Sequence, residues 1–335
     1  MQILYDYRDY SFPERTSLTI GNFDGLHLGH RQILDDVITT SRNTGTRSLL
    51  ITFQPHPLEI LNPEKAPSMI TPGTEKTHLI ENLGIDLLLV LRFDQTLSRL
   101  SGRSFVKEIL SSALRMQHIF VGKNFVFGHQ RSGDVNLLRQ MAAELDFTVH
   151  VIPEIIIRGC RISSTWIREL IQTGRISQAN RLLGRYYSLL GPVVSGEGIG
   201  RKLLFPTLNL APANQVIPQS GVYVTLTAIE GQIYPSVSNV GRRPTVSGRN
   251  LTIETHVLDI EISSPPAQME LSFVHRLRSE QKFDSIQQLK SQIQMDCQQT
   301  RLFFRRLERF HGQQSRPLSR IQMSSGGPVK AGPPD

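Results

Sequence analysis

The sequence contains only two cysteines, Cys160 and Cys297, among its 335 residues. Because they stand far apart, they argue against a disulfide framework or a cysteine-based zinc site, and they are typical of a protein in the reducing cytoplasm. Long apolar runs are also lacking, since none approaches the ~18 residues needed to cross a membrane. The N-terminal segment MQILYDYRDYSFPER has no apolar signal core. We therefore expect a cytoplasmic protein that is neither exported nor bound to a membrane.

Charge is unbalanced toward the basic side, with 37 Lys and Arg residues against 29 Asp and Glu residues and a formal net charge of +8. Such a chain can bind nucleic acid or handle phosphorylated small molecules. Part of the excess lies near the C-terminus, where a solvated helix face explains it: Arg301, Arg305, Arg306, Arg309, Arg316, Arg320 and Lys330. No stacking motif of interleaved aromatic and basic residues is evident, so we expect no nucleic-acid partner.

The length of the chain favours about two domains. Up to residue 184, apolar strand-like runs alternate with helical patterns, which predicts a parallel sheet covered by helices on both faces. The expected strands are 18–20, 48–53, 86–91, 118–121 and 148–152, and the expected helices are 32–40, 105–110 and 135–145. Ligands of such sheets bind beyond the carboxyl ends of the strands.

The pattern changes near residues 184–191. Short β-rich runs broken by Gly and Pro follow and predict a small antiparallel barrel; they are residues 187–194, 221–229, 232–240, 251–258 and 269–274. A final helix carries an apolar stripe that we expect to pack on the barrel: Ile286, Leu289, Ile293, Cys297, Thr300, Phe304 and Leu307. We expect domains at 1–184 and 185–311 and a disordered tail at 312–335.

The most informative local segment is GNFDGLHLGH, residues 21–30, which lies where a predicted strand ends and a helix begins. A Gly-rich turn there lets backbone N–H groups approach an anion, and a helix N-terminus favours negative charge. His27 and His30 are three residues apart, so they share a face of the first turn and can donate hydrogen bonds to phosphate oxygens. Phosphate binding has two alternatives: the segment could be an ordinary turn with two surface histidines, or the histidines could be a pair of metal ligands. The segment is neither a P-loop nor a dinucleotide fingerprint.

A second candidate site begins at GEGIGRK, residues 196–202, where Gly196 and Gly200 permit close backbone approach and Arg201 can neutralise phosphate. In the following FPTLN segment, Thr207 and Asn209 alternate as in a strand and offer hard oxygen ligands for Mg²⁺ bound to a nucleotide. A hairpin loop followed by a polar strand face is the alternative. Glu254 could accept a proton from a hydroxyl nucleophile, although a paired surface carboxylate is the commoner role.

Four segments of the N-terminal half together resemble the HxGH nucleotidyltransferase superfamily, in its FAD synthetase branch. They are GNFDGLHLGH at 21–30, TFQPHP at 52–57, GKNFVFG at 122–128 and ISSTWIR at 162–168. The resemblance implies a Rossmann-like domain in which the phosphate of FMN attacks the α-phosphate of ATP and releases pyrophosphate. His27 and His30 would then stabilise the reacting phosphates.

The same resemblance implies further roles, position by position. Nucleotide and phosphates would be held by Gly21, Phe23, Asp24, Gly25, Gly29, Asn124, Arg161, Ser164, Thr165 and Arg168. The flavin would be bordered by Pro55, His56, Pro57 and Phe125.

The C-terminal half resembles the riboflavin kinase module, through residues 196–209, GVY at 221–223, NVGRRPT at 239–245 and ETHVLD at 254–259. This implies transfer of the γ-phosphoryl group of ATP to the riboflavin 5′-hydroxyl, with Thr207 and Asn209 at Mg²⁺–ATP and Glu254 as the base. Over residues 16–300 the chain is thus similar to bifunctional riboflavin kinase/FAD synthetases. Riboflavin, FMN and ATP are the expected small molecules, with FMN and FAD as products.

The chain departs from the kinase pattern at three places. Leu204 stands where the module usually has Gly, and a bulky residue there could narrow a phosphate loop. Residues 263–268 replace the usual flavin-covering element, and Leu208 replaces an Ala. An FMN adenylyltransferase with an impaired kinase module therefore stays open as an alternative. Further alternatives are a flavin- or nucleic-acid-binding regulator and an HxGH adenylyltransferase acting on a pantetheine or nicotinamide mononucleotide.

Overall fold

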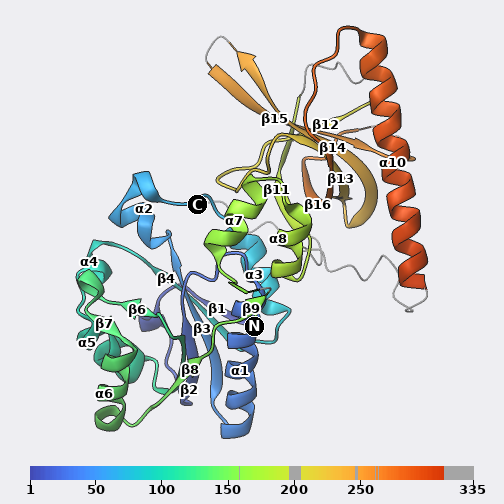
Figure 1. Cartoon of the computed structure of the whole chain (residues 1–335). Coiled ribbons are helices and arrows are strands. Elements are labelled where there is room, and N and C mark those ends of the chain that lie inside the picture. The colour runs from blue at the N-terminus through green and yellow to red at the C-terminus, as the bar shows by residue number, and fades with distance from the viewer. Residues whose placement is uncertain (158, 196–204, 246–247, 261, 263, 313–335) are drawn as a thin grey trace. The chain divides into compact units, whose positions relative to one another are not determined.

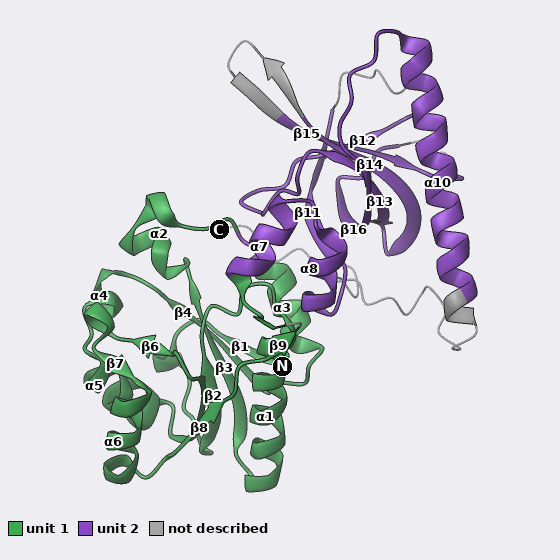
Figure 2. Ribbon diagram, viewed as in Figure 1, with its two compact units in different colours: residues 1–68, 73–164 green, residues 69–72, 165–335 purple. Residues whose placement is uncertain are grey.

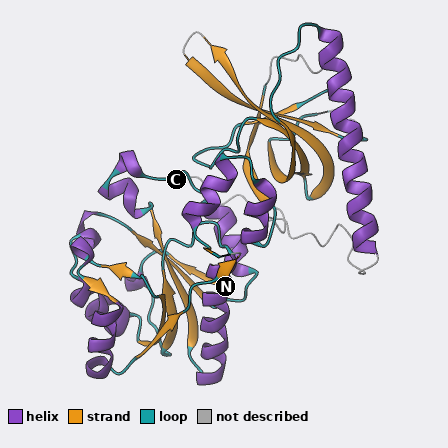
Figure 3. Cartoon of the chain, in the orientation of Figure 1, coloured by secondary structure: helices purple, strands orange, loops and turns teal. Residues whose placement is uncertain are grey.

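The computed structural model describes residues 1–157, 159–195, 205–245, 248–260, 262 and 264–312. The chain forms two compact units, residues 1–68 with 73–164 and residues 69–72 with 165–335 (Figures 1 and 2). Helices alternate with strands in the first unit, whereas strands and one long final helix make up most of the second (Figure 3).

A six-stranded parallel sheet forms the centre of the first unit, with strand order β1-β4-β3-β2-β5-β8. Its strands are β1 (Gln2–Leu4), β2 (Thr16–Ile20), β3 (Arg47–Gln54), β4 (Leu87–Arg92), β5 (Met116–Gly122) and β8 (Thr148–Ile152). The strands expected from apolar runs are all present, and β1 adds an edge strand that the sequence pattern did not indicate.

Helices cover both faces of this sheet, because successive strand residues point to opposite sides. Leu49 and Ile51 of β3 pack with η3 (Phe105–Ala113, a π-helix) and α6 (Val135–Leu145). Leu50 between them packs with α1 (Leu28–Thr44) and α3 (Gly73–Glu81). Figure 1 shows α1 and α6 on opposite sides of the strands. The prediction of a parallel sheet with helices on both faces is therefore confirmed.

Shorter elements decorate this unit. They are η1 (Tyr7–Asp9), α2 (Pro57–Leu61), η2 (Pro63–Lys65), α4 (Gln95–Ser98), α5 (Gly102–Ser104), η4 (His129–Arg131) and the two-residue strands β6 (Val126–Phe127), β7 (Gly133–Asp134), β9 (Ile156–Ile157) and β10 (Cys160–Arg161). Two helices, α7 (Ser164–Gln172) and α8 (Ile176–Leu183), precede the barrel in the chain.

The second unit contains a closed antiparallel barrel, as predicted. It has six strands in the order β11-β12-β15-β14-β13-β16, and β12 was not among the five expected runs. The strands are β11 (Tyr187–Val194), β12 (Leu208–Leu210), β13 (Gly221–Ile229), β14 (Gln232–Thr245), β15 (Gly248–Val257) and β16 (Gln268–Arg278). Inside it, the hydroxyl of Thr225 bonds to those of Ser236 and Ser238, each at 2.8 Å. Polar side chains are tolerated in the barrel interior because they form hydrogen bonds with one another.

The final helix α10 (Ile286–Gly312) packs its apolar stripe on the outer surface of the barrel. Ile293 and Cys297 contact Val222 and Val237 in one cluster, and further along the helix Phe304 lies against Val224 and Leu226 in a second. Ile286 is the exception to the predicted stripe, since its side chain is 71% exposed. The first turn of α10 extends beyond the barrel surface.

Within the described ranges, no helix is long and apolar enough to cross a membrane. Three predictions fall outside those ranges and stay predictions: the phosphate loop with Gly196, Gly200 and Arg201, the departure at Leu204, and the tail beyond residue 312.

Candidate active sites

The Gly-rich turn joins the carboxyl end of β2 to the start of α1 at the centre of the parallel sheet. Phe23 and Leu26 adopt positive φ angles of 47° and 41°, and Gly25 lies at 82°. The side chains of Phe23 and Leu26 are buried in the cluster beneath α1, which holds the turn in this costly conformation. The strand order thus presents the turn where nucleotides bind in such folds.

His27 and His30 lie together as the sequence predicts. His27 is the N-cap of α1, and its Nδ1 accepts the backbone N–H of His30 at 3.2 Å. A neutral His27 ring therefore carries its proton on Nε2. The two imidazoles stack with a centroid distance of 3.6 Å, and the ring of Phe23 lies 4.8 Å from His30.

The environment of His30 favours its neutral form. Burial, followed by the positive charges of His27 and Lys76, lowers the pKa of His30 well below its ordinary value. The Nδ1 atom of His30 is buried and has no hydrogen-bond partner. In the part of the chain that is described, no group of three or more His, Cys, Asp or Glu residues could hold a metal ion. A metal pair at this turn therefore lacks a third ligand of that kind among the described residues.

Gly29 stands between the two histidines for a steric reason. A Cβ atom at this position would lie 3.1 and 3.2 Å from the Cε1 and Nδ1 atoms of His27. Gly21, at the start of the turn, would place a Cβ 3.2 Å from the ring of Phe23. A side chain at either position would therefore push the neighbouring ring aside by a few tenths of an ångström.

Segments distant in sequence converge on the turn at Asn22 and Asp24. The side chains of Asn22 and His56 are hydrogen-bonded at 2.9 Å, which ties the TFQPHP segment to the turn. His56 also caps α2 in a capping box with Glu59. Ser164 donates its hydroxyl to the carbonyl oxygen of Asp24 at 2.8 Å. Three of the four segments that carry the family resemblance thus meet here.

The fourth segment follows β5, the neighbour of β2, and so begins at the same edge of the sheet. Asn124 and Arg161 both donate to Oε1 of Glu154, at 2.7 and 2.8 Å. Phe125 stacks on Phe127 with centroids 5.3 Å apart. Glu154 was missed by the sequence reasoning, because a lone Glu in a loop carries no distinguishing pattern.

The remaining predicted residues are placed as follows. Pro55 follows a cis peptide bond, and Pro57 is the first residue of α2. Thr165 and Arg168 lie on α7, three residues apart and so on one face, within the second unit.

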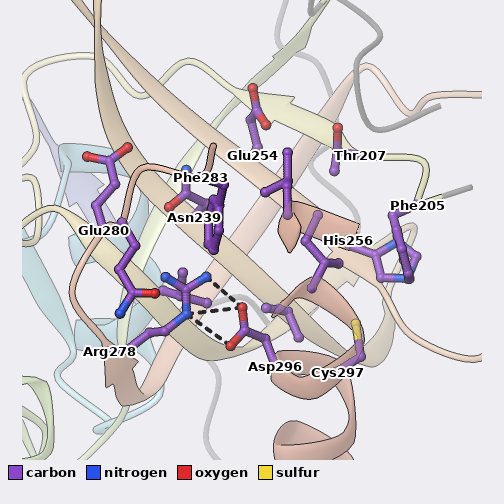
Figure 4. A pocket seen from close by; sticks show the side chains of 15 residues that line it. Phe205, Thr207, Asn239, Glu254, His256, Arg278, Glu280, Phe283, Asp296 and Cys297 are labelled. Atoms are coloured by element: carbon purple, nitrogen blue, oxygen red, sulfur yellow. Dashed lines mark hydrogen bonds and ion pairs between the residues drawn. The ribbon is translucent and has the colours of Figure 1, made fainter. Parts of the chain in front are cut away.

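The second candidate site is a cavity of about 290 Å³ between the outer surface of the barrel and α10 (Figure 4). Its wall includes Thr207, Glu254 and Asn239 from the barrel and Asp296 and Cys297 from α10. Figure 4 shows Glu254 near Thr207, with the Asp296 carboxylate on another wall. Burial raises the pKa of the Cys297 thiol to about 11, so this side chain is an apolar neighbour and not a nucleophile.

One row of residues crosses the barrel strands at the level of this cavity. Asn209 is opposite Glu254, Glu254 is opposite Asn239, and Asn239 is opposite Val222. Directly opposed residues of antiparallel strands point to the same face. The register therefore brings Asn209 and Glu254 together, although 45 residues (254 − 209) separate them. Asn209 itself lies outside the cavity lining, whereas Thr207 belongs to it.

A buried ion pair supports another wall of the cavity. The guanidinium of Arg278 donates to both carboxylate oxygens of Asp296, and its closest contact is 2.7 Å. Their side chains are 18% and 3% exposed. Gln292 donates to the same carboxylate, and Arg278 lies over the ring of Phe283 at 6.0 Å. The sequence analysis missed these residues, because none of them belongs to a motif of its own.

Two family models match this chain, one over each candidate site. Residues 9–166 match the family model described as FAD synthetase, and residues 183–304 match the one described as riboflavin kinase. The first match contains the Gly-rich turn and the second contains the barrel cavity.

Curated relatives match both halves at once. A "Bifunctional riboflavin kinase/FMN adenylyltransferase" of Escherichia coli (strain K12) is 35% identical over 288 residues, which cover 86% of this chain and 92% of the relative. A protein of the same description from Pseudomonas fluorescens is 36% identical over 279 residues, covering 83% and 89%. Among solved structures, a chain described as "Macrolide-efflux Protein" from Streptococcus pneumoniae has a TM-score of 0.82 and 27% identity, covering 90% of this chain and 98% of that one. This last likeness concerns the fold.

Proposed function

This chain belongs to the family of bifunctional riboflavin kinase/FMN adenylyltransferases, and we propose that its two reactions use the two sites described above. It phosphorylates riboflavin to FMN with ATP and adenylylates FMN to FAD. We assign the second reaction to residues 1–184, the first to residues 185–311, and neither to the tail 312–335. Both thiols, Cys160 and Cys297, are free, which supports the proposal that the enzyme works in the cytoplasm.

Adenylyl transfer is assigned to the Gly-rich turn. An oxygen of the FMN phosphate attacks the α-phosphorus of ATP, a P–O bond forms, and the bond to the β-phosphate breaks as pyrophosphate leaves. The nucleophile is already an anion, so no base has to remove a proton, and positioning and charge stabilisation dominate. His27 and His30 donate hydrogen bonds to the reacting phosphates, and the start of α1 adds its positive dipole end.

The other predicted residues of this site hold substrates. We assign nucleotide and phosphate contacts to Asn124, Arg161, Ser164, Thr165 and Arg168, with the turn glycines Gly21, Gly25 and Gly29. Pro55, His56, Pro57 and Phe125 border the flavin. The bond between Asn22 and His56 supports this division, because it fixes the flavin-side segment against the phosphate-side turn.

Riboflavin phosphorylation is assigned to the barrel cavity. Glu254 accepts the proton of the riboflavin 5′-hydroxyl while that oxygen attacks the γ-phosphorus, and ADP leaves. Thr207 and Asn209 fit a Mg²⁺ ion, since they offer hydroxyl and amide oxygens beside the Glu254 carboxylate. Bound with ATP, Mg²⁺ would neutralise charge that develops on the phosphates. The single observation that carries this assignment is the register that sets Asn209 opposite Glu254.

A time course with riboflavin and Mg²⁺–ATP, with FMN and FAD separated by chromatography, tests both assignments. The wild-type enzyme should accumulate FMN and then FAD. The His27→Ala/His30→Ala variant should stop at FMN, and Glu254→Gln should make FAD only when FMN is supplied. FAD synthesis at the wild-type rate in the folded double variant would reject the first site. Wild-type protein that adenylylates FMN but never phosphorylates riboflavin would instead establish the impaired-kinase alternative.

A further inference from the structure

A buried lysine that matches no predicted role lies beneath the adenylyl-transfer site. Lys76, in α3, is 7% exposed. Its Nζ donates to the carbonyl oxygen of Asn22 at 3.2 Å and to the hydroxyl of Thr52 at 3.1 Å. The Thr52 hydroxyl in turn donates to the same Asn22 carbonyl, at 3.3 Å. Lys76 thus joins α3, the end of β3 and the Gly-rich turn at one point.

The position of this ammonium group is costly unless its charge is used. Burial lowers the pKa of Lys76, and attraction by the buried carboxylate of Asp24 opposes that effect. Taking an ammonium group out of water is costly, and a neutral hydrogen-bond donor at the same place would avoid that cost. Holding the Asn22 carbonyl requires only a neutral donor, which the Thr52 hydroxyl already supplies. The tether alone therefore does not explain a lysine here.

A use for the charge lies in the histidine pair. The positive charge of Lys76 acts on His30, together with burial and the charge of His27. ATP brings several negative charges to the turn, and a fixed cation inside the fold offsets them without reorganisation during the reaction.

We propose that Lys76 is a positioning residue of adenylyl transfer, which fixes the Gly-rich turn on Thr52 and supplies a positive charge that acts on His30. This inference rests on the proposed function of that turn. Lys76 touches no reacting atom in this scheme and acts through the turn and the histidines.

The first test compares Lys76→Met with Lys76→Arg in the full-length enzyme, with Lys107→Met as a matched control because Lys107 is an exposed residue of η3. FAD formation from FMN and Mg²⁺–ATP is followed at saturating substrate, with thermal unfolding as the measure of folding and riboflavin phosphorylation in the same protein as the control for the second unit. We expect Lys76→Met to lower kcat for FAD formation roughly 10- to 100-fold, less than loss of a directly contacting donor. The KM for FMN and the kinase rate should stay unchanged, and Lys76→Arg should recover most of the loss.

The second test uses the titration of His30, followed by NMR of its imidazole. The charged and titratable groups that act on His30 are His27 on the same helix and Lys76 from α3, and Asp24 acts on Lys76. Removing the ammonium removes a repulsion, so the pKa of His30 should rise in Lys76→Met and stay low in Lys76→Arg. A purely structural lysine would change the melting temperature and leave this titration in place.

Several results would overturn the inference. One is an unchanged kcat in Lys76→Met, and another is a loss that Lys76→Arg does not relieve while the His30 titration stays unmoved. If Lys76→Met does not fold, Lys76→Gln replaces it with the same expectations. The His27→Ala/His30→Ala variant distinguishes failure of the proposed site from failure of the inference about Lys76. An active double variant rejects the site itself, whereas an inactive double variant with a fully active Lys76→Met rejects only the role of Lys76.

Discussion

Gly29→Ala is a small change with a defined consequence at the histidine pair. The new methyl group would lie 3.1 Å from Cε1 and 3.2 Å from Nδ1 of His27, so the ring must shift by a few tenths of an ångström. The ring is buried and stacks on His30 at 3.6 Å, which limits the directions in which it can move. A displacement of 1 Å from the reactive geometry can cost about 100-fold in rate. We expect kcat for FAD synthesis to fall about 10- to 100-fold.

The same change should leave stability nearly constant. Replacing Gly by Ala inside a helix gains about 1 kcal/mol. The shifted His27 ring weakens its N-cap bond to the His30 amide, which is worth about 1 kcal/mol. These two effects oppose each other, so the variant should unfold within about 1 kcal/mol of the wild type, and the rate can be compared in folded protein.

The assay measures FAD from supplied FMN, with riboflavin phosphorylation as an internal control. Gly73→Ala is the matched comparison, because a Cβ at the start of α3 meets nothing within 4 Å. It should keep both activities. If Gly29→Ala makes FAD at the wild-type rate, the position of the His27 ring does not limit adenylyl transfer and the argument is wrong.

Four further predictions concern the kinase site and stability. Glu254→Gln should slow riboflavin phosphorylation about 10²- to 10⁴-fold and spare FAD formation from FMN, with Glu308→Gln on the exposed side of α10 as control; intact phosphorylation would exclude Glu254 as the base. Thr207→Ala should raise the KM for Mg²⁺–ATP as well as lower kcat, and an unchanged Mg²⁺ dependence would remove Thr207 from the metal site. Asp296→Ala leaves the buried Arg278 guanidinium without its carboxylate, so denaturant unfolding should show a loss of about 3 kcal/mol or more, and a loss below 1 kcal/mol would count against the pair. Because the pKa of His30 is lowered in the fold, its contribution to stability is complete above the ordinary value of ~6.5 and is lost as pH falls below it; the decline should be smaller in His30→Asn, and equal declines would contradict this.

Much of the fold could be predicted from local patterns in the sequence. Apolar runs such as residues 48–53 predicted the strands because a strand buried on both faces has no polar alternation. The histidine pair was predictable as well, since helix geometry places residues three apart on one face. Spacing alone could not reveal β1, because three residues at a sheet edge form too short a pattern.

Contacts that depend on long-range packing could not be predicted in this way. Asn22, Thr52 and Lys76 are brought together by the order of the parallel strands and by α3, and no spacing rule connects them. The pairing of Arg278 with Asp296 likewise depends on how α10 lies on the barrel. Ile286 fits the spacing of the apolar stripe but is exposed. Helical spacing does not reveal where the barrel surface that covers the stripe ends.

The two proposed sites differ in charge as the chemistry assigned to them requires. In adenylyl transfer the nucleophile is an anion that approaches an anion, so a site suited to it has donors and positive charge, as His27, His30 and Lys76 provide. In the kinase reaction the nucleophile is a neutral hydroxyl whose proton must leave, so a carboxylate such as Glu254 becomes useful there. A further carboxylate beside the reacting phosphates, in addition to Asp24 whose charge attracts Lys76, would repel both substrates. Placing a Lys76-like cation next to Glu254 would lower the basicity that the second site needs. One catalytic site could not easily serve both steps, which gives a physical reason for two separate sites in one chain.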